Sequence, residues 1–317
     1  MLRAAKKASL FLTEFLRDAL LYIRYCGVSP FQDVGACRSY KIVIESHAIE
    51  KGLALPAPRN LFGRGKLSYI MGAIKRYDFT RSRFPIEMAA GALGAYTRFH
   101  GEQNIADPLL VEVDEAIRSL ASDRMIAPTG GVRVVPDKIP DGTSAIETRF
   151  SCRTFAPYRL LRDEIERIVA MAQRAPSQCN RQATKIYIFQ SRSQIDRLLA
   201  LQAGAAGFAH TVSNLAVISS ELVAWGGAQQ RNQPYVDGGL FSMAFLLACQ
   251  DQGYATCPLN LAITHKTENA IRSVAQIPAG ERLIMMVAFG TPLRDKPLRA
   301  AASPRRPLAE ILQIEQT

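Results

Sequence analysis

The sequence predicts an α+β fold in two parts, a helical N-terminal region and a second region in which strands and helices alternate. The first 120 residues read as helices joined by loops, and no strand stands out among them. Residues 127–143, APTGGVRVVPDKIPDGT, are rich in Pro and Gly and mark the predicted boundary. Beyond this boundary, β-branched and aromatic runs alternate with segments of helical period.

The elements of the second region can be justified in order. Apolar residues recur every three to four positions from Leu160 to Ala172, which predicts a helix over 159–174 that Pro176 ends. TKIYIFQ then has the composition of a strand. A Gly break and a short Pro-Leu-Asn turn are expected near 253–260. The predicted elements are helix 159–174, strand 184–190, helix 192–201, strand 214–219, a mostly apolar helix 238–251, helix 264–275 and strand 282–289.

Composition excludes several classes of protein. The chain has 317 residues, of which 48% are hydrophobic, so it is long enough to bury a real core. Its net charge of +11 is evenly spread: residues 1–135 carry 19 Lys and Arg against 13 Asp and Glu, and residues 136–317 carry 20 against 15. No basic domain and no nucleic-acid-binding motif stands out, so no nucleic-acid partner is predicted.

Cysteine usage and the N-terminus predict a cytoplasmic protein. The six cysteines form no CxxC pair, and a chain of this size needs no disulfides, so reduced thiols are expected. Residues 1–25 are basic and apolar, but charged residues interrupt them and no cleavage site follows, which argues against a secretory signal. These residues could lie on a membrane surface through an amphipathic face; a helix packed on its own domain is the favoured interpretation.

Two polar motifs are candidates for ligand binding. In TRFSCRTF at 148–155, an extended backbone would place Arg149, Ser151 and Arg153 on one side, which suits a phosphate or carboxylate. A solvated strand edge explains the same pattern. In APSQCNRQ at 175–182, hydroxyl and amide side chains follow a helix, as in a loop that binds a flat polar ligand or in an ordinary polar loop.

Further segments give these motifs a context. LQAGAAGFAH at 201–210 is a Gly- and Ala-rich turn, DGGLFSMAFLLAC at 237–249 is an apolar helix, and SPRRPL at 303–308 adds an arginine pair. In this order and spacing, the motifs resemble the FMN-dependent nitroreductase superfamily over about residues 144–312. The chain is most similar to longer members with polysaccharide-synthesis functions, whose N-terminal helical extension carries a segment like SHAIEKGL…FG at 46–63.

The resemblance implies a nitroreductase-like flavin domain at 144–312, with a central sheet flanked by helices, behind a helical extension of unknown role at 1–135. It implies a homodimer that binds FMN, in which NADH or NADPH reduces the flavin and the flavin reduces a second small-molecule substrate. A non-catalytic flavin-binding or assembly protein linked to polysaccharide synthesis is the alternative.

The resemblance also assigns site residues. Arg149, Ser151 and Arg305, with Arg306 as a substitute, are expected at the FMN phosphate, and Arg153 near the pyrimidine edge of the ring. A backbone N–H of Leu259 or Asn260 is expected to face flavin N5, with Pro258 and Gln202 beside the cofactor. Because the motif loop meets the flavin across the dimer interface in this family, the partner subunit would supply two more residues, Ser177 and Asn180.

Two features leave questions open. The family branch usually has Gly-Asn-x-Gly-Phe where this chain has residues 204–208, GAAGF, so an amide is lost at Ala205. The wider family often has a carboxylate at Asn260, so the substrate and the tuning of the flavin are not predicted. His47 and Glu50 could supply two metal ligands from one helix face, but no second pair accompanies them, so no metal site is predicted.

Overall fold

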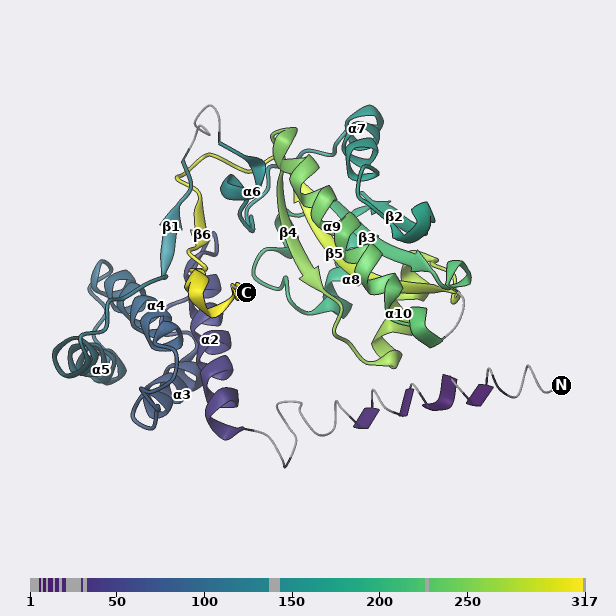
Figure 1. Cartoon of the computed structure of the whole chain (residues 1–317). Coiled ribbons are helices and arrows are strands. Elements are labelled where there is room, and N and C mark those ends of the chain that lie inside the picture. Colours follow the sequence, from purple (N-terminus) through teal and green to yellow (C-terminus); the bar gives the residue numbers. More distant parts are fainter. Residues whose placement is uncertain are drawn as a thin grey trace. The chain divides into compact units, whose positions relative to one another are not determined.

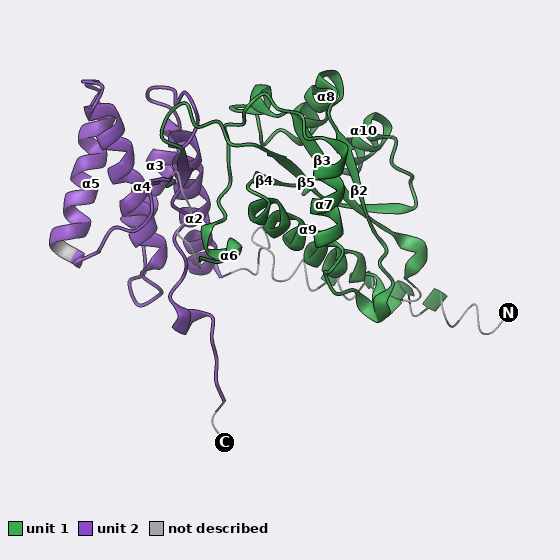
Figure 2. Cartoon of the chain, turned by 90° about the horizontal axis from the view of Figure 1, so that it is seen from above, with its two compact units in different colours: residues 1–22, 136–298 green, residues 23–135, 299–317 purple. Residues whose placement is uncertain are grey.

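The computed structural model describes residues 33–136, 143–225 and 228–315, with scattered residues between 6 and 30. Most of the segment 1–25 therefore lies outside the described residues. The chain divides into two compact units, coloured separately in Figure 2. We call residues 1–22 and 136–298 the sheet unit, and residues 23–135 and 299–317 the helical unit. Within the described residues, no helix has the length and apolar character needed to cross a membrane.

The helical unit is built around helix α4 (Phe84–Gly101), which packs against the other three long helices of the unit. Small side chains in FPIEMAAGALGAYTRFHG let the neighbouring helices approach closely, and α4 is buried along most of its length. Asp33 and Asp107 cap two of the helices by accepting backbone N–H bonds from Ala36 (3.0 Å) and Leu109 (2.9 Å). The remaining elements are α2 (Val34–Leu53), α3 (Arg64–Ile74), α5 (Pro108–Arg124), β1 (Val132–Val134) and β6 (Arg299–Ala301).

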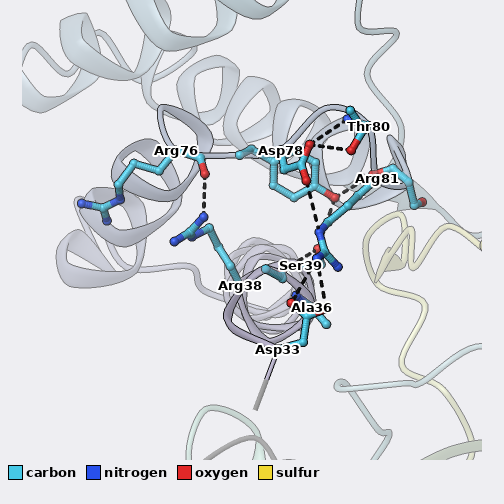
Figure 3. Close-up of polar contacts among 11 residues, drawn as sticks. Asp33, Ala36, Arg38, Ser39, Arg76, Asp78, Thr80 and Arg81 are labelled. Carbon is cyan, nitrogen blue, oxygen red and sulfur yellow. Dashed lines mark hydrogen bonds and ion pairs between the residues drawn. The ribbon is translucent and has the colours of Figure 1, made fainter. Parts of the chain in front are cut away.

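An ion-pair cluster fixes the start of α2, as Figure 3 shows. The Arg81 guanidinium donates to both carboxylate oxygens of Asp33 at 3.0 Å and lies 3.5 Å from Asp78. The Ala36 N–H, followed by Arg81, lowers the pKa of Asp33, and Thr80 lowers that of Asp78. A neighbouring bond from Arg38 to the Arg76 carbonyl (2.6 Å) joins α2 to the end of α3. These contacts therefore tie the start of α2 to the end of α3 and to the loop that contains Asp78 and Arg81.

The sheet unit confirms the predicted α+β fold with a central sheet flanked by helices (Figure 1). Four antiparallel strands lie in the order β2-β3-β5-β4. The central strand β3 (Asn214–Glu221) reads NLAVISSE and is buried almost throughout. The remaining elements are α6 (Ala145–Thr148), α7 (Arg162–Ala172), β2 (Thr184–Phe189), α8 (Arg192–Gln202), α9 (Gln233–Asp251), β4 (Ala255–Asn260), α10 (His265–Ala275) and β5 (Glu281–Gly290).

Helices cover both faces of the sheet. Helices α7 and α9 pack on one face, where Phe245 and Phe289 meet edge to face with ring centroids 5.4 Å apart. Helices α8 and α10 pack against each other on the other side of the sheet (Figure 2). The sheet unit thus has its own apolar core, and the ends of its strands remain available to position polar groups.

The structure corrects two predicted elements. The segment ATCPLN, which was predicted to be part of a Gly break and a turn, forms strand β4 at an edge of the sheet. Pro258 has no N–H to donate, and an edge strand tolerates this because only one side of it is paired. Helix α9 also begins at Gln233, before the predicted start at 238. Its first turn contains Pro234, which fits a helix start because the first N–H groups of a helix have no partner within it.

Candidate functional site

The polar motif at 149–153 lies beside strand β4. Ser151 forms a parallel bridge with Thr256, and the Cys152 N–H donates to the Thr256 carbonyl at 2.8 Å. Arg153 is only 9% exposed, and its Nη1 donates to the Ser151 carbonyl at 3.3 Å. The backbone pairing thus explains why this motif is held at the β4 edge instead of on a solvated loop.

A second group of predicted residues meets at the other end of the same strand. The Gln202 side chain, at the end of α8, donates to the Asn260 carbonyl at 3.0 Å and accepts the Gly204 N–H at 2.7 Å. Asn260 ends β4 and is exposed, whereas Leu259 is buried. Alternate residues of an antiparallel edge strand direct their N–H groups away from the neighbouring strand. One of Leu259 and Asn260 therefore presents its N–H to the open edge.

Strand β4 consequently joins two groups of predicted site residues. Ser151 is paired with Thr256 near its start, and Gln202 contacts Asn260 at its end. Thr256 and Asn260 are four residue steps apart, or roughly 13 Å at the usual rise of about 3.3 Å per residue. The edge can therefore serve an elongated ligand with different polar groups at its two ends.

Thr256 is a residue of this edge that the sequence analysis did not identify. It is 1% exposed, and within the described residues its hydroxyl oxygen has no hydrogen-bond partner. Buried hydroxyl groups are usually satisfied, so the missing partner makes Thr256 an unusual polar residue beside Ser151. The sequence signal for Thr256 is its position two residues before Pro258. This signal has a meaning only if the segment is a strand, and strand β4 was not predicted.

The APSQCNRQ loop occupies the opposite edge of the sheet, directly before β2. The Ser177 hydroxyl accepts the Gln182 N–H at 3.1 Å, and Asn180 is exposed in a left-handed conformation with φ 55°. Asp237 of α9, which is 3% exposed, accepts the Gln178 N–H at 3.0 Å and so ties the loop to that helix. Asp237 begins the DGGLFSMAFLLAC motif of the sequence, but its role as an acceptor for this loop was not predicted.

A cavity of about 330 Å³ lies beside this loop. Its lining includes the loop residues Ser177 and Gln182, strand residues Lys185 and Tyr187, and Phe241 of α9. The polar groups of the strand have partners of their own: Lys185 contacts Glu221 at 2.6 Å, and Tyr187 donates to Glu281 at 2.8 Å. The cavity therefore has a mixed lining, in which Phe241 is apolar and the polar groups of Lys185 and Tyr187 already have partners.

Strand order separates the two sets of predicted residues. Ser151, Arg153 and Asn260 lie at the β4 edge, whereas Ser177 and Asn180 lie next to β2. Three strand spacings of about 4.8 Å put the edges roughly 14 Å apart. The structure therefore brings the predicted residues together as two groups, and not as one.

The last predicted arginine lies in the other unit. Arg305 is exposed and belongs to the helical unit, where its Nη1 donates to the Ser303 carbonyl at 2.5 Å. Its contribution to the phosphate site stays a prediction.

The remaining candidate groups have local partners. His47 Nδ1 lies 3.1 Å from the buried carboxylate of Glu50, and the described residues contain no cluster of three or more metal-ligating side chains. Cys152, Cys179 and Cys249 are free thiols, and Cys26 lies outside the described residues. Burial raises the pKa of Cys152 to about 12, so this thiol stays protonated near neutral pH.

Comparison with known proteins agrees with the motifs. Residues 146–229 match the model of the nitroreductase family. Among curated proteins, none matches the chain. A nitroreductase-like protein from Streptococcus mutans is 20% identical, with 54% of this chain and 96% of that one covered and a TM-score of 0.47. A nitroreductase family protein from Clostridium novyi NT is 23% identical over 47% and 83% of the two chains, with a TM-score of 0.41.

An FMN-dependent nitroreductase from Clostridium difficile R20291 is 14% identical, with 49% of this chain and 90% of that one covered and a TM-score of 0.42. The family match begins directly before Arg149 and includes the whole APSQCNRQ loop. It thus covers two of the motifs that carried the predicted resemblance, which is confirmed. The match to the nitroreductase family lies within the sheet unit and covers residues 146–229.

Proposed function

We propose that the sheet unit binds FMN along the β4 edge and works as an NAD(P)H-dependent oxidoreductase. The observation that carries this proposal is that β4 holds the 149–153 motif at its start and the Gln202–Asn260 contact at its end. These groups fit the cofactor: arginines and hydroxyls suit a phosphate, and backbone N–H groups suit a flavin ring edge. Among the described residues, the buried hydroxyl of Thr256 at the same edge has no hydrogen-bond partner.

The residues of the chain would bind and tune the cofactor. Arg149 and Ser151 would hold the phosphate, whose charge is close to two negative units, through charge-assisted hydrogen bonds. The largely buried Arg153 would stabilise negative charge on the ring, and Leu259 or Asn260 would direct an N–H at flavin N5. When bound, FMN supplies the redox chemistry, taking reducing equivalents from NADH or NADPH and passing them to a second small molecule.

The active form would be a homodimer. Ser177 and Asn180 lie at the edge opposite β4, so contact with the same flavin is best provided by a second subunit. Helix α9 supports this arrangement, because Val236 (51%) and Leu240 (44%) leave an apolar face exposed. A helix that is apolar on both faces is normally covered on both. A second copy of the chain is therefore the proposed cover.

Flavin content tests the proposal directly. The purified protein is expected to be yellow, and denaturation should release a flavin with the mass of FMN. The reconstitution control is apo-protein titrated with FMN, for which Arg149→Ala should bind more weakly. A colourless protein that takes up no added FMN would rule out the proposed cofactor.

A non-catalytic flavin-binding or assembly protein is the second candidate. The observation that favours it is the 203–207 turn, where Ala205 is buried and the Asn amide usual in this branch is missing. Anaerobic stopped-flow mixing with NADH or NADPH separates the two functions. Rapid bleaching of the flavin supports the oxidoreductase, whereas a spectrum unchanged by both donors supports the binding role.

A further inference from the structure

Large apolar side chains are exposed near the start of the chain. The described residues between 6 and 20 are all helical and all exposed. Five of them are large and apolar, with exposed fractions of 38% for Phe11, 63% for Leu12, 54% for Phe15, 54% for Leu16 and 65% for Leu20. The rings of Phe11 and Phe15 stack with their centroids 6.4 Å apart. A group of exposed apolar side chains of this kind usually marks a surface that contacts a partner.

The sequence of residues 2–24, here called the N-terminal segment, has the period of an amphipathic helix. At about 100° per residue, the five apolar side chains fall within one half of the helix circumference, together with Ala8 and Ala19. The opposite half takes the basic residues of the segment, Arg3, Lys6, Lys7, Arg17 and Arg24. Leu10 and Leu21 are large apolar residues that depart from this pattern.

The charge of the N-terminal segment favours an anionic surface as its partner. The segment carries five Arg and Lys against two Asp and Glu, a surplus of three positive charges. A helix with one apolar half and one basic half lies in a membrane interface, where its apolar side chains enter the acyl boundary and its cations meet the headgroups. Packing against the sheet unit would instead bury Phe15 and Leu16, which are half exposed.

The N-terminal segment is suited to lie on a membrane and not to cross it. Glu14, Arg17 and Asp18 lie in its middle, and a spanning helix would bury these charges in hydrocarbon. We propose that the N-terminal segment binds the surface of membranes that contain anionic phospholipids, with Phe11 and Phe15 among the side chains that enter the interface. This binding is separate from the proposed FMN site and needs no flavin.

Flotation of the full-length protein with lipid vesicles tests the proposal. One set of vesicles contains phosphatidylcholine alone, and the other contains phosphatidylcholine mixed with the anionic lipid phosphatidylglycerol. The parent protein is expected to float with the anionic vesicles at low salt and to float less at high salt, because salt screens the charges of the headgroups. A parent protein that floats with neither set, or equally with both, would overturn the proposal.

Two substitutions separate the apolar contribution from the electrostatic one. Phe15→Ser should weaken binding to anionic vesicles about tenfold at low and high salt alike, because it removes apolar surface without changing the charge. Lys6→Gln should weaken binding about fivefold at low salt and much less at high salt, because it removes one cation. Val111→Ser takes away an exposed apolar side chain of α5 and is the matched control, with unchanged binding expected. Full binding by Phe15→Ser would refute the insertion of the apolar half.

Light scattering without vesicles tests a second copy of the chain as the partner of the apolar half. Phe15→Ser is expected to keep the mass of the parent protein, because the proposed partner of this side chain is lipid. A lower mass for Phe15→Ser, combined with full binding to anionic vesicles, would assign the apolar half to a contact between copies and overturn the proposal.

Discussion

Helices α4 and α9 have similar apolar sequences but different surroundings. Helix α4 is covered by α2, α3 and α5 of its own unit, and Leu93 and Tyr96 are fully buried. Helix α9 buries Phe245 against the sheet, yet Val236 and Leu240 on its other side are half exposed. Apolar character therefore indicates that a helix is to be covered on both faces. It does not indicate whether the cover comes from the same chain.

The largest expected effect is on α4, through Gly91. A Cβ at this position would lie 1.9 Å from the Thr129 carbonyl oxygen, and that backbone is held by the Thr129 N–H bond to Glu87. Gly91→Ala should therefore lower the free energy of unfolding by about 3 kcal/mol in chemical denaturation. Gly94→Ala on the same helix is the control, since its closest contact is a flexible Arg98 atom at 3.4 Å. Equal denaturation midpoints for the two variants would contradict the packing described for α4.

The next effect concerns the exposed face of α9. Leu240→Asp should weaken the proposed dimer about thirtyfold or more, because a charge would be buried at the centre of an apolar contact. Light scattering across a dilution series measures this change. Val111→Asp, on an exposed position of α5, provides the control and should keep the parent's mass. If Leu240→Asp and the parent dissociate at the same concentration, α9 is not the subunit interface.

The β4 edge predicts different behaviour for two arginines. Arg149→Ala should lose roughly 1.5–3 kcal/mol of charge-assisted contact, which corresponds to about tenfold weaker FMN binding or more. Arg153→Ala should bind oxidised FMN nearly as the parent does, but with a lower reduction potential, because a cation that favours the anionic reduced form is gone. Flavin titration and potentiometry measure both. Stronger loss of binding in Arg153→Ala than in Arg149→Ala would reverse these roles.

The smallest effect is the pH dependence of the α4 core. Burial raises the pKa of Tyr96 to about 12 from 10.0, and its hydroxyl donates to the Phe62 carbonyl at 2.8 Å. Because the folded state favours the neutral phenol, this stability is complete below pH 10 and is lost as the pH rises towards 12. At pH 11 the loss is about 1 kcal/mol. Tyr96→Phe should flatten this part of the stability curve, and an unaltered curve would argue against a titrating Tyr96.

Two parts of the candidate site could be predicted because each is a short motif of neighbouring residues in the sequence. The motif around Arg149 and the loop around Ser177 keep recognisable residue types at fixed spacing, and the family match covers both. Strand β4 was missed because Pro258 and the preceding Gly253 are turn signals when the neighbouring strand is unknown. Its pairing with β5 supplies the hydrogen bonds that make the segment extended.

The sequence by itself determined the order of helices and strands in the sheet unit apart from β4, the apolar character of α9 and the motifs that match the nitroreductase family, since periodicity and turn residues act over short distances. The tertiary structure decided which partner each polar group finds. It bonds Glu50 to Gly131, places Arg306 between Tyr40 and Phe84, and sets the two polar motifs, at 149–153 and 175–182, on opposite sheet edges. These contacts join residues far apart in the chain, and no local pattern specifies them.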